Sequence, residues 1–151
     1  MLKQFIIIFT VCVFSSSEAK QWIEVNSSDI KKSSFTHQSN GLSSTEISFE
    51  LSGYFLETSK NGAKISAPGG VPMLKKGSPD LPVFTTSIQI PDLAKMQLEV
   101  ISSEYIDVKV ESVIPSRGNI TRDINISSVP FKKGLAYDKN SFYPDNIAFL
   151  R

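Results

Sequence analysis

The sequence predicts an all-β protein, an antiparallel β-sandwich of the immunoglobulin-like or jelly-roll-like kind, preceded by a signal peptide that is cleaved off. Several short runs alternate apolar and polar residues, which is the period of a half-buried strand. Glycine, proline and asparagine separate these runs, as turn residues do. A sustained helical period is missing throughout. A mature chain of roughly 130 residues is long enough to form one domain with its own core.

The amino-terminal end has the features of a secretory signal peptide. Residues 1–3 are short and basic, residues 5–14 are an unbroken apolar run, and Ala19 ends a stretch of small residues. We expect cleavage after Ala19, which makes Lys20 the first residue of the mature chain. The apolar run is too short for a stable membrane anchor. Residues 1–19 are therefore predicted to direct export and to be removed, which places the mature chain in the periplasm, at the cell surface or outside the cell.

The count of cysteines and histidines limits the chemistry of the mature chain. Cys12 is the one cysteine and lies in the signal peptide, so no disulfide, thiolate nucleophile or cysteine-based metal site remains. His37 is the one histidine, and we expect it at the surface. The 16 basic and 15 acidic residues nearly cancel, which argues against nucleic acid and membrane surfaces as partners. We expect no cofactor, no metal and no obligate oligomer.

The early part of the mature chain divides into two regions. Residues 20–42 are rich in serine, lysine and asparagine and predict a loosely structured lead-in with one short strand at residues 21–25. Residues 43–151 are the predicted sandwich domain, and its first strand is expected over residues 45–52. Asn61-Gly62 is a strong hairpin signal, so the runs on either side of it should pair.

Three further strands are predicted after a segment rich in proline and glycine. Each alternates apolar and polar residues, and they span residues 83–90, 95–102 and 105–114. The last of them continues into residues 113–122. Pro115 is expected to end the ladder of hydrogen bonds, and Gly118 and Asn119 to make a tight turn.

The resulting loop could project the guanidinium groups of Arg117 and Arg122 beyond the sheet. A solvated turn between two strands is the simpler interpretation, and from this stretch alone it is the better one.

No constellation of residues in the sequence points to catalysis. A Ser-His-Asp triad would need His37, and no Gly-x-Ser-x-Gly turn is present. Paired carboxylates fall on the outward faces of predicted strands, as in Glu46 with Glu50 and Asp107 with Glu111. We therefore expect a protein that is not an enzyme. Asn-x-Ser/Thr triplets begin at Asn26, Asn119 and Asn125, and they matter only if the host glycosylates its proteins.

A succession of short motifs is more specific than any of them alone. In order they are Gly77-Ser-Pro-Asp-Leu-Pro82, Met96 through Tyr105, Ile114-Pro-Ser-Arg-Gly118, Ile120-Thr-Arg122, Val129-Pro-Phe131 and Tyr137 through Pro144. In this order they resemble the amino-terminal propeptide of the gingipain-type secreted cysteine peptidases. The residues before Ser43 add nothing to the resemblance.

The resemblance implies a non-catalytic β-sandwich prodomain that keeps its peptidase latent and assists its folding, with export through the type IX pathway. The implied partner is the catalytic domain of a gingipain-type cysteine peptidase. In arginine-specific members, a loop arginine of the prodomain occupies the substrate pocket of that domain. The corresponding position here is Arg122, with Arg117 as the second choice and Gly118 between them in the loop. The planar fork of arginine suits this task because it can bond a pocket carboxylate with two hydrogen bonds.

Other interpretations stay open at this point. Family prodomains continue past residue 151 and a catalytic domain should follow, so we expect a truncated fragment with an unpaired edge near residues 147–150. The chain could also be an exported binding module for a cell-surface protein or glycan, using an aromatic patch of Tyr137, Phe142 and Tyr143. A nonfunctional gene fragment is the third interpretation.

Overall fold

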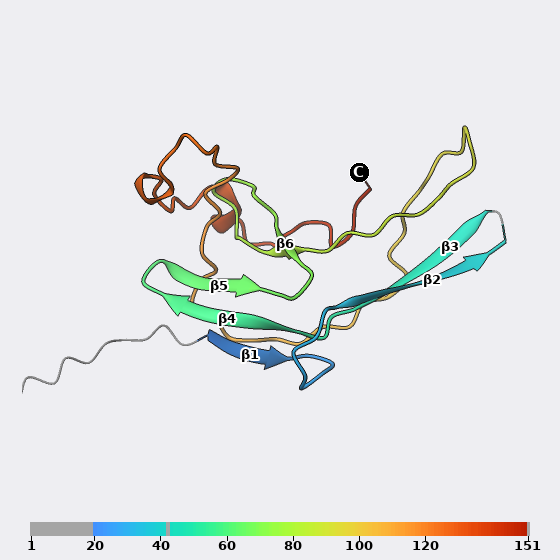
Figure 1. Ribbon diagram of the computed structural model, residues 1–151, viewed down its shortest axis with the longest axis horizontal. Coiled ribbons are helices and arrows are strands. Elements are labelled where there is room, and N and C mark those ends of the chain that lie inside the picture. The colour runs from blue at the N-terminus through green and yellow to red at the C-terminus, as the bar shows by residue number, and fades with distance from the viewer. Residues whose placement is uncertain (1–19, 42, 151) are drawn as a thin grey trace, which may run out of the picture.

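A computed structural model describes residues 20–41 and 43–150 and shows an all-β protein with antiparallel sheets (Figure 1). This confirms the predicted fold class, and the arrangement is consistent with a β-sandwich. The strands are β1 (Lys20–Glu24), β2 (Ser34–Asn40), β3 (Ser44–Glu50), β4 (Gly53–Ser59), β5 (Gly62–Ser66), β6 (Val71–Pro72) and β7 (Pro82–Val83).

The helices of the described part are two short 3₁₀ turns, η1 (Ile126–Ser128) and η2 (Leu135–Tyr137). None of the helices in residues 20–41 and 43–150 has the length and apolar character that crossing a bilayer requires. The predicted signal peptide, with Ala19 at its cleavage position, lies outside the described residues.

The main sheet has three strands in the order β1-β4-β5, all antiparallel. The ring of Trp22 on β1 packs edge-on against that of Phe55 on β4, with centroids 5.0 Å apart. The β4–β5 hairpin that the Asn61-Gly62 signal predicts does form, with Lys60 and Asn61 in the turn and Gly62 as the first residue of β5. Gly62 has φ +125°, and a Cβ there would lie 2.8 Å from the carbonyl oxygen of Ser112, so only glycine fits this turn.

The second sheet is the β2–β3 hairpin, which extends away from the main sheet (Figure 1). The ring of Phe49 on β3 lies 4.9 Å from that of Phe35 on β2 and 4.9 Å from that of Phe84. β2 lies in the segment where the sequence predicted one strand and a loose remainder, so that expectation missed a strand. Phe35 is the one apolar residue in β2. The pairing of β2 with β3 therefore makes this segment a strand, and the periodicity of β2 does not. The domain boundary at residue 43 stays a prediction.

The most buried part of the protein lies where residues 112–116 pass between β5 and residues 77–80. The backbone N–H of Ile114 donates to the carbonyl of Ala63 at 2.8 Å, and that of Asp80 donates to the carbonyl of Ile114 at 2.9 Å. The buried apolar side chains of the described part are Ala63, Ala67, Ile114 and Pro115, and no large side chain there is fully buried. The core is therefore small and centred on Ile114.

The three strands predicted over residues 83–114 are wrong for most of their length. Val83 belongs to β7 and Val113 forms an isolated bridge with Ala63, whereas residues 84–112 are extended without pairing into a sheet. Figure 1 shows this stretch, yellow-green to yellow, as a long excursion beside the β2–β3 hairpin. Alternation is a property of one segment, but a strand also needs a neighbouring backbone to bond to. The apolar side chains of this stretch consequently stay exposed, among them Leu93, Ile101 and Tyr105.

Candidate functional site

The candidate site is the arginine loop, residues 117–129, which follows the buried segment around Ile114 and is drawn in orange in Figure 1. Pro115 and Ser116 are buried at its base. The backbone N–H of Ser116 donates to the carbonyl of Ser78, and the N–H of Gly77 donates to the carbonyl of Ser116, both at 2.8 Å. Pro115 was expected to end a ladder, but it forms an antiparallel bridge with Pro79. The loop therefore starts from a fixed point.

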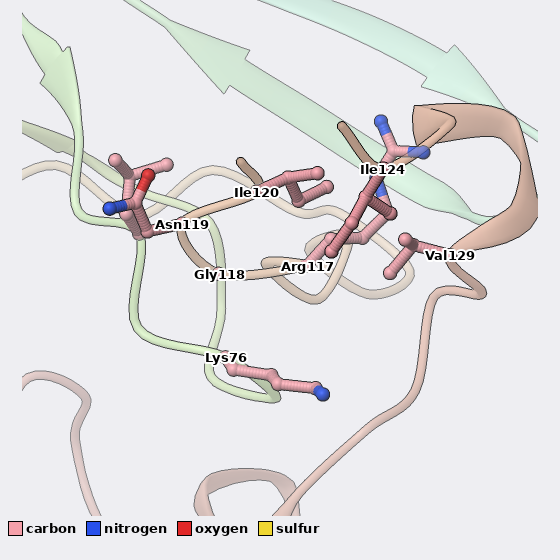
Figure 2. A pocket seen from close by; sticks show the side chains of 8 residues that line it. Lys76, Arg117, Gly118, Asn119, Ile120, Ile124 and Val129 are labelled. Atoms are coloured by element: carbon pink, nitrogen blue, oxygen red, sulfur yellow. The ribbon is translucent and has the colours of Figure 1, made fainter. Parts of the chain in front are cut away.

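Arg117 fastens the loop to itself. One of its guanidinium nitrogens, Nη1, donates to the carbonyl of Ile126 at 2.8 Å, and the guanidinium carbon lies 4.5 Å from the centroid of the Phe131 ring. Arg117, Ile124 and Val129 gather on one side of the loop (Figure 2). Because Arg117 joins two positions nine residues apart, it closes the loop near its base.

Gly118 makes the turn that follows. Its φ is +82°, the left-handed region predicted for it, and a Cβ at this position would lie 3.0 Å from the Cβ of Lys76. Its backbone N–H donates to the hydroxyl of Ser116 at 3.2 Å. Asn119 was expected to share the left-handed conformation, but within the described residues positive φ outside glycine occurs at Leu74 and Leu93.

Arg122 lies at the exposed turn of the loop. The backbone N–H of Ile124 donates to the carbonyl of Thr121 at 3.2 Å, which places Arg122 and Asp123 at the two central positions of a turn. In the part of the chain that the structure describes, the Arg122 guanidinium has no hydrogen bond, ion pair or ring contact. The structure thus separates the two candidate arginines, Arg117 at the base and Arg122 at the turn.

The segment after the turn has its own hydrogen bonds. The side chain of Asn125 accepts from the backbone N–H of Ser127 at 3.0 Å and caps η1, and the hydroxyl of Ser128 donates to the carbonyl of Asn125 at 2.7 Å. The sequence indicated Asn125 only as the start of a glycosylation triplet. The same Asn-Ile-Ser-Ser sequence is also a local capping signal, which predicts this role.

A cavity of about 350 Å³ opens behind the loop (Figure 2). Its lining combines apolar side chains with two cations and contains no acid: Leu74, Lys76, Arg117, Gly118, Asn119, Ile120, Ile124 and Val129. A site of this composition can hold side chains of a partner, but it offers no group that would act as a general base or nucleophile.

Asp80 is a half-buried acid beside the core. Its Oδ1 has no hydrogen-bond partner among the described residues. Burial raises the pKa of the Asp80 carboxyl, while Lys64 and Arg117 act in the opposite direction. The backbone N–H of Asp80 donates to the carbonyl of Ile114, so its main chain, and not its carboxyl, joins this residue to the core.

The aromatic residues proposed as a patch do not form one surface. The hydroxyl of Tyr137 donates to the carbonyl of Val113 at 2.7 Å, and burial, Asp80 and Tyr143 raise its pKa to about 12. The hydroxyl of Tyr143 donates to the sulfur of Met73 at 3.1 Å. Phe142 is 95% exposed. Two of the three aromatic residues therefore pack against the body, and one is open to solvent.

The other residues weighed for chemistry remain apart. His37 is exposed, and its Nε2 lies 3.1 Å from the hydroxyl of Thr86. Within residues 20–41 and 43–150, no group of three His, Cys, Asp or Glu side chains is placed to hold a metal ion.

Comparison with known proteins shows the family. Residues 32–151 match the family model described as Propeptide_C25. The chain belongs to this family. The resemblance to gingipain propeptides is thereby confirmed, and a Propeptide_C25 chain is not a catalytic domain.

Two relatives of this Propeptide_C25 chain are gingipains of Porphyromonas gingivalis. Gingipain R1 is 37% identical over 81 residues, which are 54% of this chain and 8% of the relative. Gingipain R2 is 34% identical over 96 residues, which are 63% of this chain and 13% of the relative. The chain thus spans a small part of the length of the curated relatives it matches. No solved structure matches the chain.

Proposed function

We propose that this Propeptide_C25 chain keeps a gingipain-type cysteine peptidase latent by presenting Arg122 to the pocket that selects arginine substrates. It also assists the folding of that peptidase. The observation that carries the proposal is the exposed guanidinium of Arg122, which has no partner among the described residues and lies at the turn of a loop whose base is fastened by Arg117.

Arg122 suits this task better than Arg117. The guanidinium of Arg117 already donates to Ile126 and stacks on Phe131, so docking it in a pocket would break both contacts. The guanidinium of Arg122 is free to form two parallel hydrogen bonds with a pocket carboxylate. When propeptide and peptidase belong to one chain, an effective concentration on the order of millimolar would strengthen even a modest contact.

The extended stretch of residues 84–112 supports the role in folding. Leu93, Ile101 and Tyr105 are 103%, 80% and 85% exposed, which is far more apolar surface than one short segment of a monomer normally leaves in water. The catalytic domain is the partner that we propose to cover this stretch. Covering it would remove apolar surface of both chains from water, which favours the folded state of each.

We propose export as a further part of this function. The predicted signal peptide would direct the chain across the inner membrane, with cleavage between Ala19 and Lys20, and the type IX pathway would complete its secretion. Amino-terminal sequencing of the extracellular chain tests this step. A first residue other than Lys20 would contradict the predicted cleavage site.

Inhibition of an arginine-specific peptidase tests the proposed role of Arg122. The full chain is added to gingipain R1 of Porphyromonas gingivalis, and the inhibition constant is measured with an arginyl substrate. Arg122→Ala should weaken inhibition about tenfold or more, because a hydrogen bond to a charged group contributes about 1.5 kcal/mol. Lys31→Ala, which removes an exposed cation outside both the arginine loop and residues 84–112, is the control and should leave the constant unchanged. An unchanged constant in Arg122→Ala would exclude Arg122 from the interaction.

A further inference from the structure

A second cavity, of about 430 Å³, has no residue of the arginine loop in its lining. It opens between residues 75–78 and residues 134–145, which meet where the backbone N–H of Gly134 donates to the carbonyl of Gly77 at 2.8 Å. A Cβ at Gly134 would lie 3.0 Å from that carbonyl oxygen, so glycine permits the close approach. The volume of this cavity is within the range of ligand-binding sites.

The charges in the lining of this cavity, the lysine cavity, are mostly positive. They are the ammonium groups of Lys75, Lys76 and Lys139 and the carboxylate of Asp145. The Lys139 ammonium lies 3.9 Å from the Asp145 carboxylate, and the two side chains are 60% and 69% exposed. An ion pair as long and as exposed as this one is weak. The cavity therefore attracts an anion, and Lys139 is able to exchange Asp145 for the carboxylate of a ligand.

The most buried side chain of the lysine cavity is a serine whose hydroxyl lacks a partner. Ser78 is 5% exposed. Its backbone N–H and carbonyl are bonded to Lys75 and Ser116, but its hydroxyl has no hydrogen bond within the described part of the chain. The other buried serines there, Ser52 and Ser116, each use the hydroxyl in a hydrogen bond. Because a buried hydroxyl without a partner is costly, a ligand that bonds to Ser78 would remove this cost.

Apolar side chains adjoin the cations of the lysine cavity. Phe142 and Leu135 belong to its lining and are 95% and 81% exposed. Tyr143 also lines it and is held in place, since its hydroxyl donates to the sulfur of Met73 at 3.1 Å. Exposed apolar groups next to ammonium groups match a ligand that carries an apolar group beside a negative charge.

A peptide satisfies the lysine cavity better than a sugar does. A sugar presents many hydroxyls, which need acceptors as well as donors. Lysine donates but cannot accept, and the one carboxylate of the lining, that of Asp145, already faces Lys139. A glutamate or aspartate next to an apolar residue needs only ammonium groups, a hydroxyl and an apolar surface. The lining provides all three.

We propose that the lysine cavity binds a peptide segment in which an acidic side chain adjoins an apolar one, and that the peptidase supplies this segment. The second part rests on the proposed function. The match to this chain covers 8% of gingipain R1, and the segment is to be found in the remainder. The cavity is then a contact separate from Arg122, and two contacts between tethered partners strengthen each other.

Two blocked dipeptides test the chemistry of the cavity without the peptidase. Acetyl-Glu-Leu-amide has the acidic and the apolar side chain, and acetyl-Gln-Leu-amide is its neutral control. Each is titrated into the full chain while NMR follows the backbone amides. The acidic peptide should shift the signals of Ser78 and Phe142 with a dissociation constant on the order of millimolar, as a ligand of this size allows. The neutral peptide should bind about tenfold more weakly, and added salt should weaken the acidic peptide alone.

Charge reversal tests whether the peptidase supplies the segment. The double variant Lys75→Glu with Lys139→Glu should lose the acidic peptide and should inhibit gingipain R1 about tenfold more weakly than the wild type. Lys31→Glu with Lys60→Glu changes the net charge equally at exposed positions outside the cavity and is the control. Phe142→Ala is the second variant, because so exposed a side chain contributes little to the fold. It should weaken both interactions, whereas Phe142→Leu keeps an apolar group and should stay close to the wild type.

The outcomes separate this inference from the function beneath it. An acidic peptide that binds no more tightly than the neutral one would refute an acidic ligand. A galacturonate trisaccharide that shifts Ser78 and Phe142 where the acidic peptide does not would refute a peptide. Variants of the cavity that inhibit as well as their controls would refute the peptidase as the partner, while the role of Arg122 stays intact. A wild-type chain that fails to inhibit gingipain R1 would refute the proposed function, and with it the source of the segment.

Discussion

Replacing Arg117 with glutamine tests whether this side chain fastens the arginine loop. Arg117→Gln removes the hydrogen bond to the carbonyl of Ile126 and the contact with the ring of Phe131. Because this bond is exposed to solvent, its net contribution is about 1 kcal/mol, less than that of a charged bond in a closed pocket. A cation over an aromatic ring at an exposed site adds about 0.5 to 1 kcal/mol. The two contacts together stabilise the closed loop by about 1.5 to 2 kcal/mol.

This loss should appear as faster local opening. Amide hydrogen exchange of residues 117–129 should speed up roughly tenfold to thirtyfold, while exchange in β4 and β5 stays unchanged. Arg117→Lys keeps the charge but loses the flat guanidinium, and it should fall between the wild type and Arg117→Gln.

Arg122→Gln is the matched control, because it removes an exposed arginine of the same loop that has no contact among the described residues. It should leave exchange rates as in the wild type. Equal exchange rates in Arg117→Gln and the wild type would refute the argument that Arg117 closes the loop.

Two further predictions concern the small core. Burial raises the pKa of the Asp80 carboxyl above its value in the unfolded chain, so the native state binds the proton more tightly than the unfolded chain does. The free energy of unfolding should therefore fall as the pH rises from the unfolded pKa through the raised pKa. Asp80→Asn should lose this pH dependence in chemical denaturation, and an identical pH profile would contradict it. Ile114→Ala should lower the free energy of unfolding by about 2 kcal/mol or more, since Ile114 is 6% exposed. Ile106→Ala, at a position 56% exposed, should cost less than about 0.5 kcal/mol, and equal losses would contradict the location of the core.

Features that depend only on residues adjacent in the sequence could be predicted from it. The β4–β5 hairpin forms where Asn61-Gly62 predicts it, because Gly62, directly after the turn, can adopt the positive φ of +125° that this connection needs. Gly118 has the left-handed conformation for the same reason. The class of the protein was also evident, because alternation without helical period excludes amphipathic helices.

The alternation of apolar and polar residues did not determine which segments pair as strands. Residues 84–112 alternate well and remain unpaired, whereas β2 alternates poorly and is a complete strand opposite β3. Strand formation depends on a second backbone, which lies elsewhere in the chain, and the sequence of one segment does not contain it.

In the arginine loop, too, some features follow from the local sequence and others from the tertiary structure. The sequence by itself predicted a turn at Gly118, between Arg117 and Arg122, because Gly118 and its polar neighbours specify a turn locally, but it did not predict the second turn, from Thr121 to Ile124, that carries Arg122. Only the tertiary structure decided which guanidinium is engaged, because the partners of Arg117 are the carbonyl of Ile126 and the ring of Phe131, which the folded loop brings back to its base. The freedom of a side chain depends on what the fold places beside it, and here the two partners lie nine and fourteen residues further along the chain.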